Sequence, residues 1–200
     1  IIMFDETFHQ SELSSGMKFP EYLTSKNILP GIKVDQGLED FSPFEKLTIG
    51  LDGLSERLEK YYSLGAKFAK WRAVITPGDS IPTDDCILAN AKSLAKYAKK
   101  CQQANLVPIV EPEVLMDGAH TIDESFDITS RTLNMVFDQL DQYNVSLQGI
   151  VLKPNMILSG YECSYQASIE EVAEKTINCL SAHVPSEAVS YTHLRAHETP

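Results

Sequence analysis

The feature that most constrains this chain is a series of short apolar runs that each end on charged side chains. The run over residues 147–152 stops at Lys153, and Pro154 cannot continue the pairing of a strand. Four other runs end in the same way, with stretches of helical periodicity between them. Strands that alternate with helices predict parallel pairing, and right-handed crossovers then leave a doubly wound sheet or a barrel.

The charged residues at the run ends favour the barrel. They are Asp5 and Glu6, Lys33 and Asp35, Lys70 and Arg72, Glu111 and Glu113, and Lys153. Three of these sets are spaced i, i+2, which places both members on the same side of a strand. Consecutive strands bring such groups to one common mouth in a (β/α)₈ barrel but not in a doubly wound sheet.

The length of the repeats limits how much of a barrel is present. We expect strands at residues 1–4, 28–34, 68–75, 106–110 and 147–152, and a loop over most of 35–50. Each repeat takes roughly 40 residues, and a barrel needs eight of them. The sequence therefore predicts an α/β chain that forms an incomplete TIM barrel, and its start at Ile1 suggests an internal fragment.

Composition excludes several classes of function. The chain has 200 residues, of which 43% are hydrophobic and 22% charged, as in ordinary globular proteins. Its formal net charge of −11 disfavours nucleic acid or an anionic membrane as a partner. The four cysteines lack zinc-ligand spacing, and no apolar stretch reaches the roughly 18 residues of a membrane span. A cytoplasmic, reducing location is the expectation.

The residue types at the expected mouth indicate chemistry on a small anion. Four cations beside carboxylates in an acidic protein favour a phosphate ester as substrate. Glu111 and Glu113 form a like-charge pair suited to acid–base catalysis. Lys153 follows an apolar run, and such surroundings favour the neutral, nucleophilic amine that Schiff-base enzymes use. The alternatives are a lysine that reaches solvent from a strand end and a network of structural ion pairs.

Five motifs in order resemble the second to sixth strand exits of the class I (Schiff-base) fructose-bisphosphate aldolase family. They are residues 4–10 (FDETFHQ), 30–35 (PGIKVD), 65–72 (GAKFAKWR), 107–113 (VPIVEPE) and 152–156 (LKPNM). The likeness covers residues 1–189 and predicts a partial aldolase TIM-barrel domain there. Residues 190–200 resemble nothing in the family, and we expect them to be an unrelated or artefactual tail.

The resemblance implies a role for each residue at the mouth. Lys153 would condense with the substrate ketone, and Glu111 would carry protons for carbinolamine dehydration. Glu113 would be the hydrogen-bonded neighbour of Glu111 in the catalytic group, and Lys70 would assist electrostatically. Lys33, Asp35 and Arg72 would bind the substrate. The implied reaction is reversible cleavage of fructose 1,6-bisphosphate to dihydroxyacetone phosphate and glyceraldehyde 3-phosphate, without metal or cofactor. The implied partners are sugar phosphates and, in the full-length protein, the other subunits of a homotetramer.

Departures from the family pattern leave alternatives open. The family's first, seventh and eighth strands and its C-terminal tyrosine have no counterpart here, so we expect these 200 residues alone to be inactive and poorly stable. A non-catalytic aldolase-like scaffold is one alternative. An enolase-type metal-dependent lyase is the other, although it needs three carboxylates around magnesium. His193 and His197 have helical spacing but lack the glutamate of a zinc-binding HExxH motif.

Overall fold

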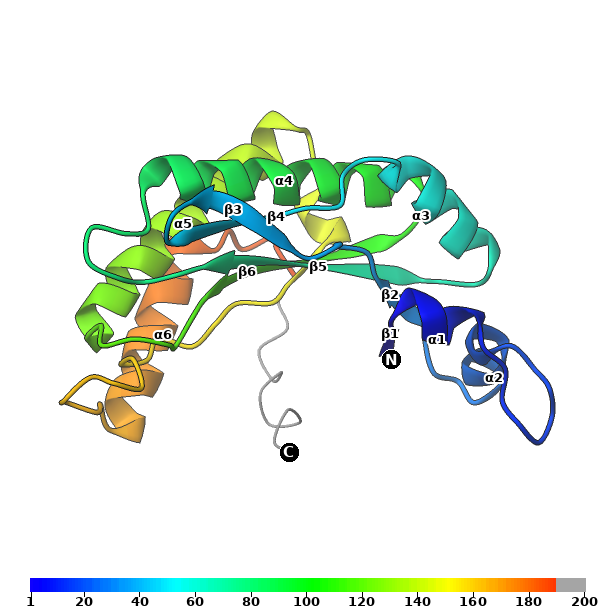
Figure 1. The fold of residues 1–200 in the computed structure, drawn as a ribbon, viewed down its shortest axis with the longest axis horizontal. Coiled ribbons are helices and arrows are strands. Elements are labelled where there is room, and N and C mark those ends of the chain that lie inside the picture. Colours follow the sequence, from blue (N-terminus) through cyan, green and yellow to red (C-terminus); the bar gives the residue numbers. More distant parts are fainter. Residues whose placement is uncertain (190–200) are drawn as a thin grey trace.

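Five strands run parallel in one sheet, and neighbours in the sheet follow one another along the chain (Figure 1). The computed structural model describes residues 1–189. The strands are β1 (Ile2–Met3), β2 (Gly31–Lys33), β5 (Phe68–Ile75), β6 (Val107–Val114) and β7 (Val151–Leu152), in that order across the sheet. A doubly wound sheet would reverse its direction of growth at some point. This sheet does not, so the predicted incomplete barrel is confirmed.

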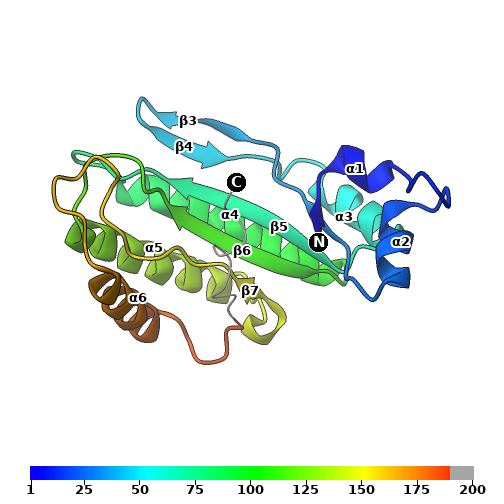
Figure 2. The ribbon, with the colours of Figure 1, turned by 90° about the horizontal axis from the view of Figure 1, so that it is seen from below.

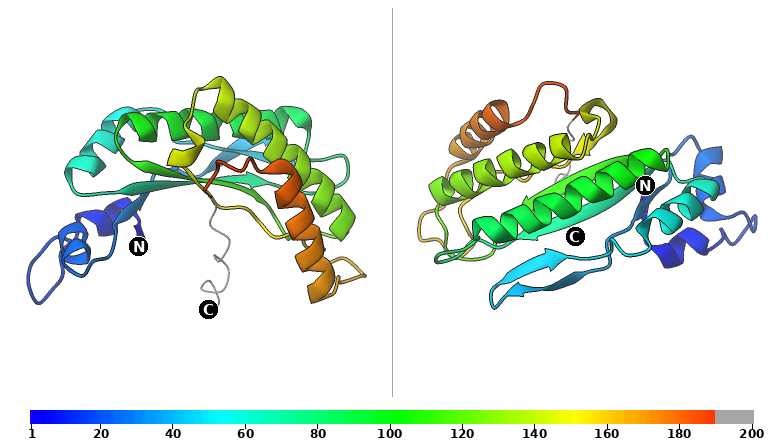
Figure 3. Two further views of the ribbon diagram at one scale, coloured as in Figure 1. Left: turned by 180° about the vertical axis from the view of Figure 1, so that it is seen from behind. Right: turned by 90° about the horizontal axis from the view of Figure 1, so that it is seen from above.

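Helices α3 (Leu54–Ser63), α4 (Asp84–Gln103) and α5 (Ile122–Gln142) lie on one face of the sheet, and α6 (Ile169–His183) packs against α5 (Figure 3). Two short helices, α1 (Asp5–His9) and α2 (Phe19–Ser25), lie near β1 and β2 (Figure 1). Helix α4 packs on β5 and β6, and α3 and α5 flank it (Figure 3). Seen from below, β5 and β6 have no helix of residues 1–189 in front of them (Figure 2). No described helix is long and apolar enough to cross a membrane.

Strand alternation decides which side chains enter the core between the sheet and the helices. Trp71 on β5 and Val110 on β6 are register partners, and both are fully buried. The Trp71 ring packs on Tyr97 of α4, with ring centroids 5.4 Å apart. Trp71 is therefore a core residue, as the alternation with Lys70 predicts.

The opposite, inner face of the sheet is apolar at the amino ends of the strands. There the Phe68 ring covers Gly31 so closely that a Cβ atom on residue 31 would lie 2.1 Å from the ring. Ile2 and Val107 on this face remain 44% and 40% exposed. The amide of Leu152 donates to the carbonyl of Val189 (2.8 Å), at the free edge of β7 where a sixth strand would pair. Among the described residues, the sheet therefore has two edges without a partner strand, and no helix covers β5 and β6 on its inner face (Figure 2).

Several strand and loop boundaries differ from the sequence prediction. β6 continues through Pro112 to Val114, beyond the predicted end at Val110. The carbonyl of Val110 accepts a hydrogen bond from the amide of Lys153, which directly follows β7. Because backbone groups alternate between the two edges of a strand, the backbone nitrogen of Pro112 faces the same edge, past the last residue of β7. No partner strand needs an N–H there, so proline is tolerated. Residues 147–149 form a 3-10 turn rather than the start of β7.

The predicted loop between β2 and α3 contains a β-hairpin. Strands β3 (Leu38–Ser42) and β4 (Glu45–Thr48) pair antiparallel beside β5 (Figure 2). Most β3 side chains are exposed, so no apolar alternation marked the strand. The anchor is Glu45, only 2% exposed, which accepts hydrogen bonds from the Thr83 amide (2.7 Å) and hydroxyl (3.0 Å) at the start of α4.

The Glu45 anchor leads to a prediction about local stability. Burial raises the pKa of Glu45, but hydrogen bonds from Thr83, Ser42 and Cys86 lower it by more, so the pKa lies below the ordinary 4.5. The carboxylate therefore contributes its full stabilisation at neutral pH, and this is lost as the pH falls through the lowered value. Glu45→Gln should speed tryptic cleavage after Lys46 at pH 7 about tenfold, the effect of losing one charge-assisted hydrogen bond.

A matched control tests whether the anchor and not the charge of the hairpin is responsible. Glu39 lies on β3 and is exposed, so Glu39→Gln changes the net charge equally. It should leave the cleavage rate unchanged. Equal rates for Glu45→Gln and the parent protein would show that Glu45 does not hold the hairpin.

Candidate active site

The inner face of the sheet brings Lys70, Glu111 and Lys153 into direct contact. Glu111 Oε1 lies 2.6 Å from Lys153 Nζ, and Glu111 Oε2 lies 2.8 Å from Lys70 Nζ. The Glu111 side chain is 3% exposed, and those of Lys153 and Lys70 are 13% and 16% exposed. One carboxylate therefore lies between two lysines that come from the strands on either side of it.

The strand register explains why these three residues meet. Lys70 stands opposite Ile109, and Glu111 follows Ile109 by one step on the same face of β6. Arg72 stands opposite Glu111 and contacts Glu113, one step further along. Each β5 cation thus reaches diagonally to the β6 carboxylate nearer the carboxyl end of the sheet. Lys153 follows β7 directly, and its amide donates to Val110 on β6.

Lys33 and Asp35 extend the cluster towards β2. Lys33 is the register partner of Lys70, so the two lysines stand on neighbouring strands. Lys33 Nζ lies 2.5 Å from Asp35 Oδ1 and 5.7 Å from the centroid of the Phe4 ring. Five of the seven predicted site residues therefore lie on one face of the sheet, and the other two, Asp35 and Lys153, follow the ends of β2 and β7 and contact members of this group. Their formal charges, four cations and three carboxylates, leave one positive charge in excess, which favours an anionic ligand.

Two expectations about the site need correction. Asp5 and Glu6 do not join the cluster, because α1 begins at Asp5, whose carboxylate accepts the Tyr61 hydroxyl at 2.7 Å. Glu111 and Glu113 were expected to act as a like-charge pair, yet each has a cation beside it. Asp5 has its partner on helix α3, and Glu111 and Glu113 have theirs on or beside neighbouring strands, which spacing within one strand does not reveal.

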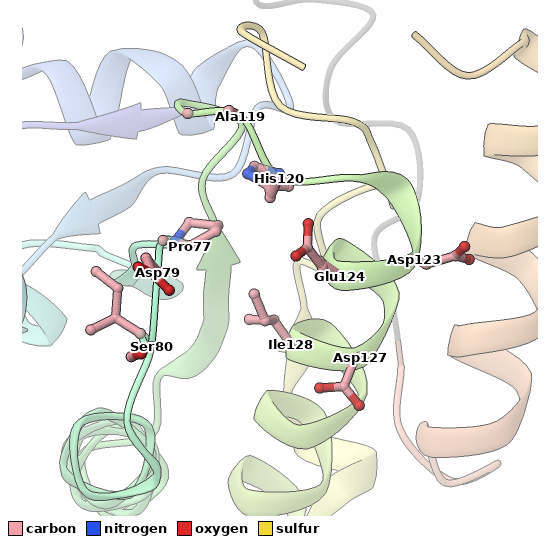
Figure 4. A pocket seen from close by; sticks show the side chains of 12 residues that line it. Pro77, Asp79, Ser80, Ala119, His120, Asp123, Glu124, Asp127 and Ile128 are labelled. Atoms are coloured by element: carbon pink, nitrogen blue, oxygen red, sulfur yellow. The ribbon is translucent and has the colours of Figure 1, made fainter. Parts of the chain in front are cut away.

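A pocket of about 770 Å³ lies apart from this cluster (Figure 4). The loops after β5 and β6 and the first turns of α5 form its walls, and none of the seven residues lines it. His120 lies in a loop of this wall and is only 8% exposed. Burial lowers the pKa of His120, although Glu124 and the Leu158 carbonyl oppose the change, so the ring is neutral at pH 7.

Metal-ligating residues do not converge in the part of the chain that the structure covers. Within residues 1–189, no three His, Cys, Asp or Glu side chains are placed so that they could hold a metal ion. His193 and His197, the spaced pair noted in the sequence, lie outside the described residues.

Comparisons with known proteins point to a single family. A family model described as "Fructose-bisphosphate aldolase class-I" matches residues 1–196. A "Probable fructose-bisphosphate aldolase class 1" from Xanthomonas axonopodis pv. citri is 52% identical over 187 residues, which cover 92% of this chain and 56% of the relative. The corresponding enzyme of Toxoplasma gondii is 48% identical over 188 residues, covering 92% of this chain and 52% of the relative.

A solved structure gives the same result for the fold. Fructose-bisphosphate aldolase from Plasmodium falciparum, determined in complex with TRAP and a small-molecule inhibitor, superposes with a TM-score of 0.89 at 44% identity. The superposition covers 93% of this chain and 55% of that one.

This chain spans about half the length of the curated relatives it matches. The family match runs to residue 196, while the boundary expected between residues 189 and 190 stays a prediction. With the family model, the parallel sheet and the superposition in agreement, the chain belongs to the class I fructose-bisphosphate aldolase family.

Proposed function

We propose that the full-length protein cleaves fructose 1,6-bisphosphate reversibly to dihydroxyacetone phosphate and glyceraldehyde 3-phosphate through an imine on Lys153. The observation that carries this proposal is the contact of Lys153 with Glu111, and of Glu111 with Lys70, on a largely buried sheet face. A nucleophilic lysine needs a proton carrier within hydrogen-bonding reach, and Glu111 at 2.6 Å meets that requirement.

The proposed sequence begins at the substrate ketone. The neutral Lys153 amine attacks the carbonyl carbon, and a proton passes from the nitrogen to the oxygen to give a neutral carbinolamine. Glu111 delivers a second proton to that hydroxyl, water leaves, and an iminium ion forms. Base removal of the C4 hydroxyl proton then breaks the C3–C4 bond. C4 becomes the aldehyde carbon of glyceraldehyde 3-phosphate, which leaves, and the electron pair of the broken bond passes into the iminium to give an enamine. Protonation of the enamine and addition of water release dihydroxyacetone phosphate and restore the amine.

The remaining cluster residues support these steps. Lys70 lies against the other oxygen of Glu111 and stabilises negative charge there while protons move. Glu113 holds Arg72 in place, and Arg72, Lys33 and Asp35 bind the phosphorylated substrate. By its family resemblance, the full-length protein is expected to act as a cytoplasmic homotetramer.

Testing this requires a complete barrel. The completed protein is the full-length protein that carries this chain, or the barrel made by joining residues 1–189 to the flanking segments of the Xanthomonas relative. Triose phosphate release from fructose 1,6-bisphosphate, followed with a coupled dehydrogenase, should be readily measured. A folded completed protein that binds the sugar phosphate without cleaving it would instead support the non-catalytic scaffold.

Chelation distinguishes the proposed chemistry from that of a metal-dependent barrel lyase. In the imine route the electron pair passes into a covalent iminium, so no Lewis acid takes part. Prolonged dialysis of the completed protein against EDTA should therefore change kcat by less than about twofold, against the orders of magnitude that loss of a catalytic metal costs. Loss of activity that magnesium restores would favour the enolase-type alternative.

A further inference from the structure

The carbonyl of Arg72 lies on the edge of β5 that faces β2, at a position that β2 does not reach. β2 ends at Lys33, and the last backbone bond to this edge runs from the Val34 amide to the Lys70 carbonyl, at 3.1 Å. Alternation turns the Arg72 carbonyl to the same edge, beyond the end of β2. The hydroxyl of Thr48, on β4 of the hairpin, donates to it at 2.9 Å. Thr48 thus occupies the place of the missing strand.

Thr48 is itself held from a second direction. It is 2% exposed, and its amide donates to Oδ1 of Asn90, which lies on α4 and is 1% exposed. The Asn90 side-chain amide donates to the Lys46 carbonyl at 2.9 Å and to the Cys86 carbonyl at 3.2 Å. A continuous buried chain of hydrogen bonds therefore runs from α4 through the hairpin to the backbone of Arg72.

We infer that Thr48 is a positioning residue for Arg72, and through it sets the affinity for the phosphorylated substrate. The inference rests on the proposed function, in which Arg72 binds that substrate. The Arg72 side chain is 41% exposed and contacts Glu113 on the neighbouring strand. Its contact with Glu113 and its aim towards a ligand both depend on where the β5 backbone lies, and past the end of β2 the Thr48 hydroxyl holds that backbone.

The test uses two substitutions at one buried position. Thr48→Val keeps the shape of the side chain and removes the hydroxyl, whereas Thr48→Ser keeps the hydroxyl. In the completed protein, Thr48→Val should raise KM for fructose 1,6-bisphosphate about three- to tenfold, the effect of one lost hydrogen bond, with kcat within about twofold. Thr48→Ser should leave KM for fructose 1,6-bisphosphate at the parent value. In an Arg72→Ala background, Thr48→Val should raise KM no further, because the residue it positions is gone.

Amide hydrogen exchange tests the positioning without any activity measurement. Thr48→Val should speed exchange in peptides covering residues 68–75 and leave peptides covering residues 129–137 of α5 unchanged. Faster exchange with an unchanged KM in an active enzyme would overturn the inference while the proposed function stands. The inference would also be overturned if Thr48→Val raised KM by the same factor in the Arg72→Ala background as in the parent protein. An inactive but folded parent protein would remove the proposed function, and this inference with it.

Discussion

In the completed protein, Lys153→Met is expected to lower kcat for fructose 1,6-bisphosphate cleavage by a factor on the order of 10⁴ to 10⁶, the range that follows loss of a covalent nucleophile. Methionine has nearly the length of lysine but no amine, so no imine can form. Glu111 keeps its contact with Lys70, which leaves the carboxylate paired and the sheet intact. Steady-state kinetics measures the loss, and thermal unfolding checks the fold.

Two comparisons make the Lys153 result specific. Lys67 precedes β5 and is exposed, so Lys67→Met removes a lysine outside the cluster and should leave kcat unchanged. Substrate affinity of the Lys153→Met protein, measured by equilibrium dialysis, should stay within about tenfold of the parent, because the proposed phosphate-binding residues are untouched. Activity within tenfold of the parent protein would exclude Lys153 as the nucleophile.

Glu111→Gln is expected to lower both activity and stability. The substitution leaves Lys70 and Lys153 on either side of a neutral amide in a largely buried site. Removing one partner from a buried ion pair typically costs about 3–5 kcal/mol, and loss of a general acid–base typically costs 10² to 10⁴ in rate. Urea unfolding and steady-state kinetics of the completed protein measure the two effects separately.

A second substitution distinguishes the stability lost through repulsion between Lys70 and Lys153 from the activity lost with the proton carrier. In Glu111→Gln/Lys70→Met, the two lysines no longer face each other, so most of the lost stability should return while the activity stays low. Glu59 is an exposed residue of α3, and Glu59→Gln should change neither quantity. Full activity in Glu111→Gln would contradict the proposed role in proton transfer. No recovery of stability in the double variant would mean that the lysines do not repel each other.

Patterns within a single strand predicted much of the fold and the members of the site. The alternation of Lys70, Trp71 and Arg72 assigns opposite faces to neighbours, and the structure buries Trp71 completely while Lys70 and Arg72 lie on the inner face. The apolar run before Pro154 located β7 and Lys153 at its end. These inferences succeeded because each depends only on the period of a strand and on the missing N–H of proline.

Contacts between residues on different strands could not be predicted from the sequence of any single strand. Nothing within residues 107–114 indicates that Glu111 lies between two lysines, because that depends on the register of β5 and β7 against β6. The β3–β4 hairpin was missed because its stability comes from buried Glu45 and Thr48, whose partners lie on α4 and β5. A buried carboxylate or hydroxyl carries no sequence signature until its partner is known.

The most direct test of the account is to trap the imine on the completed protein. Borohydride reduction with dihydroxyacetone phosphate should yield a stable secondary amine on the peptide that contains Lys153, found by mass spectrometry. Lys70→Met should slow adduct formation, because Lys70 contacts the proton carrier Glu111. The adduct should still form on Lys153, whose position directly after β7 does not depend on Lys70. The adduct should be absent in Lys153→Met. An adduct mainly on Lys33 or Lys70, or none in an active enzyme, would contradict the assignment of Lys153 as the nucleophile.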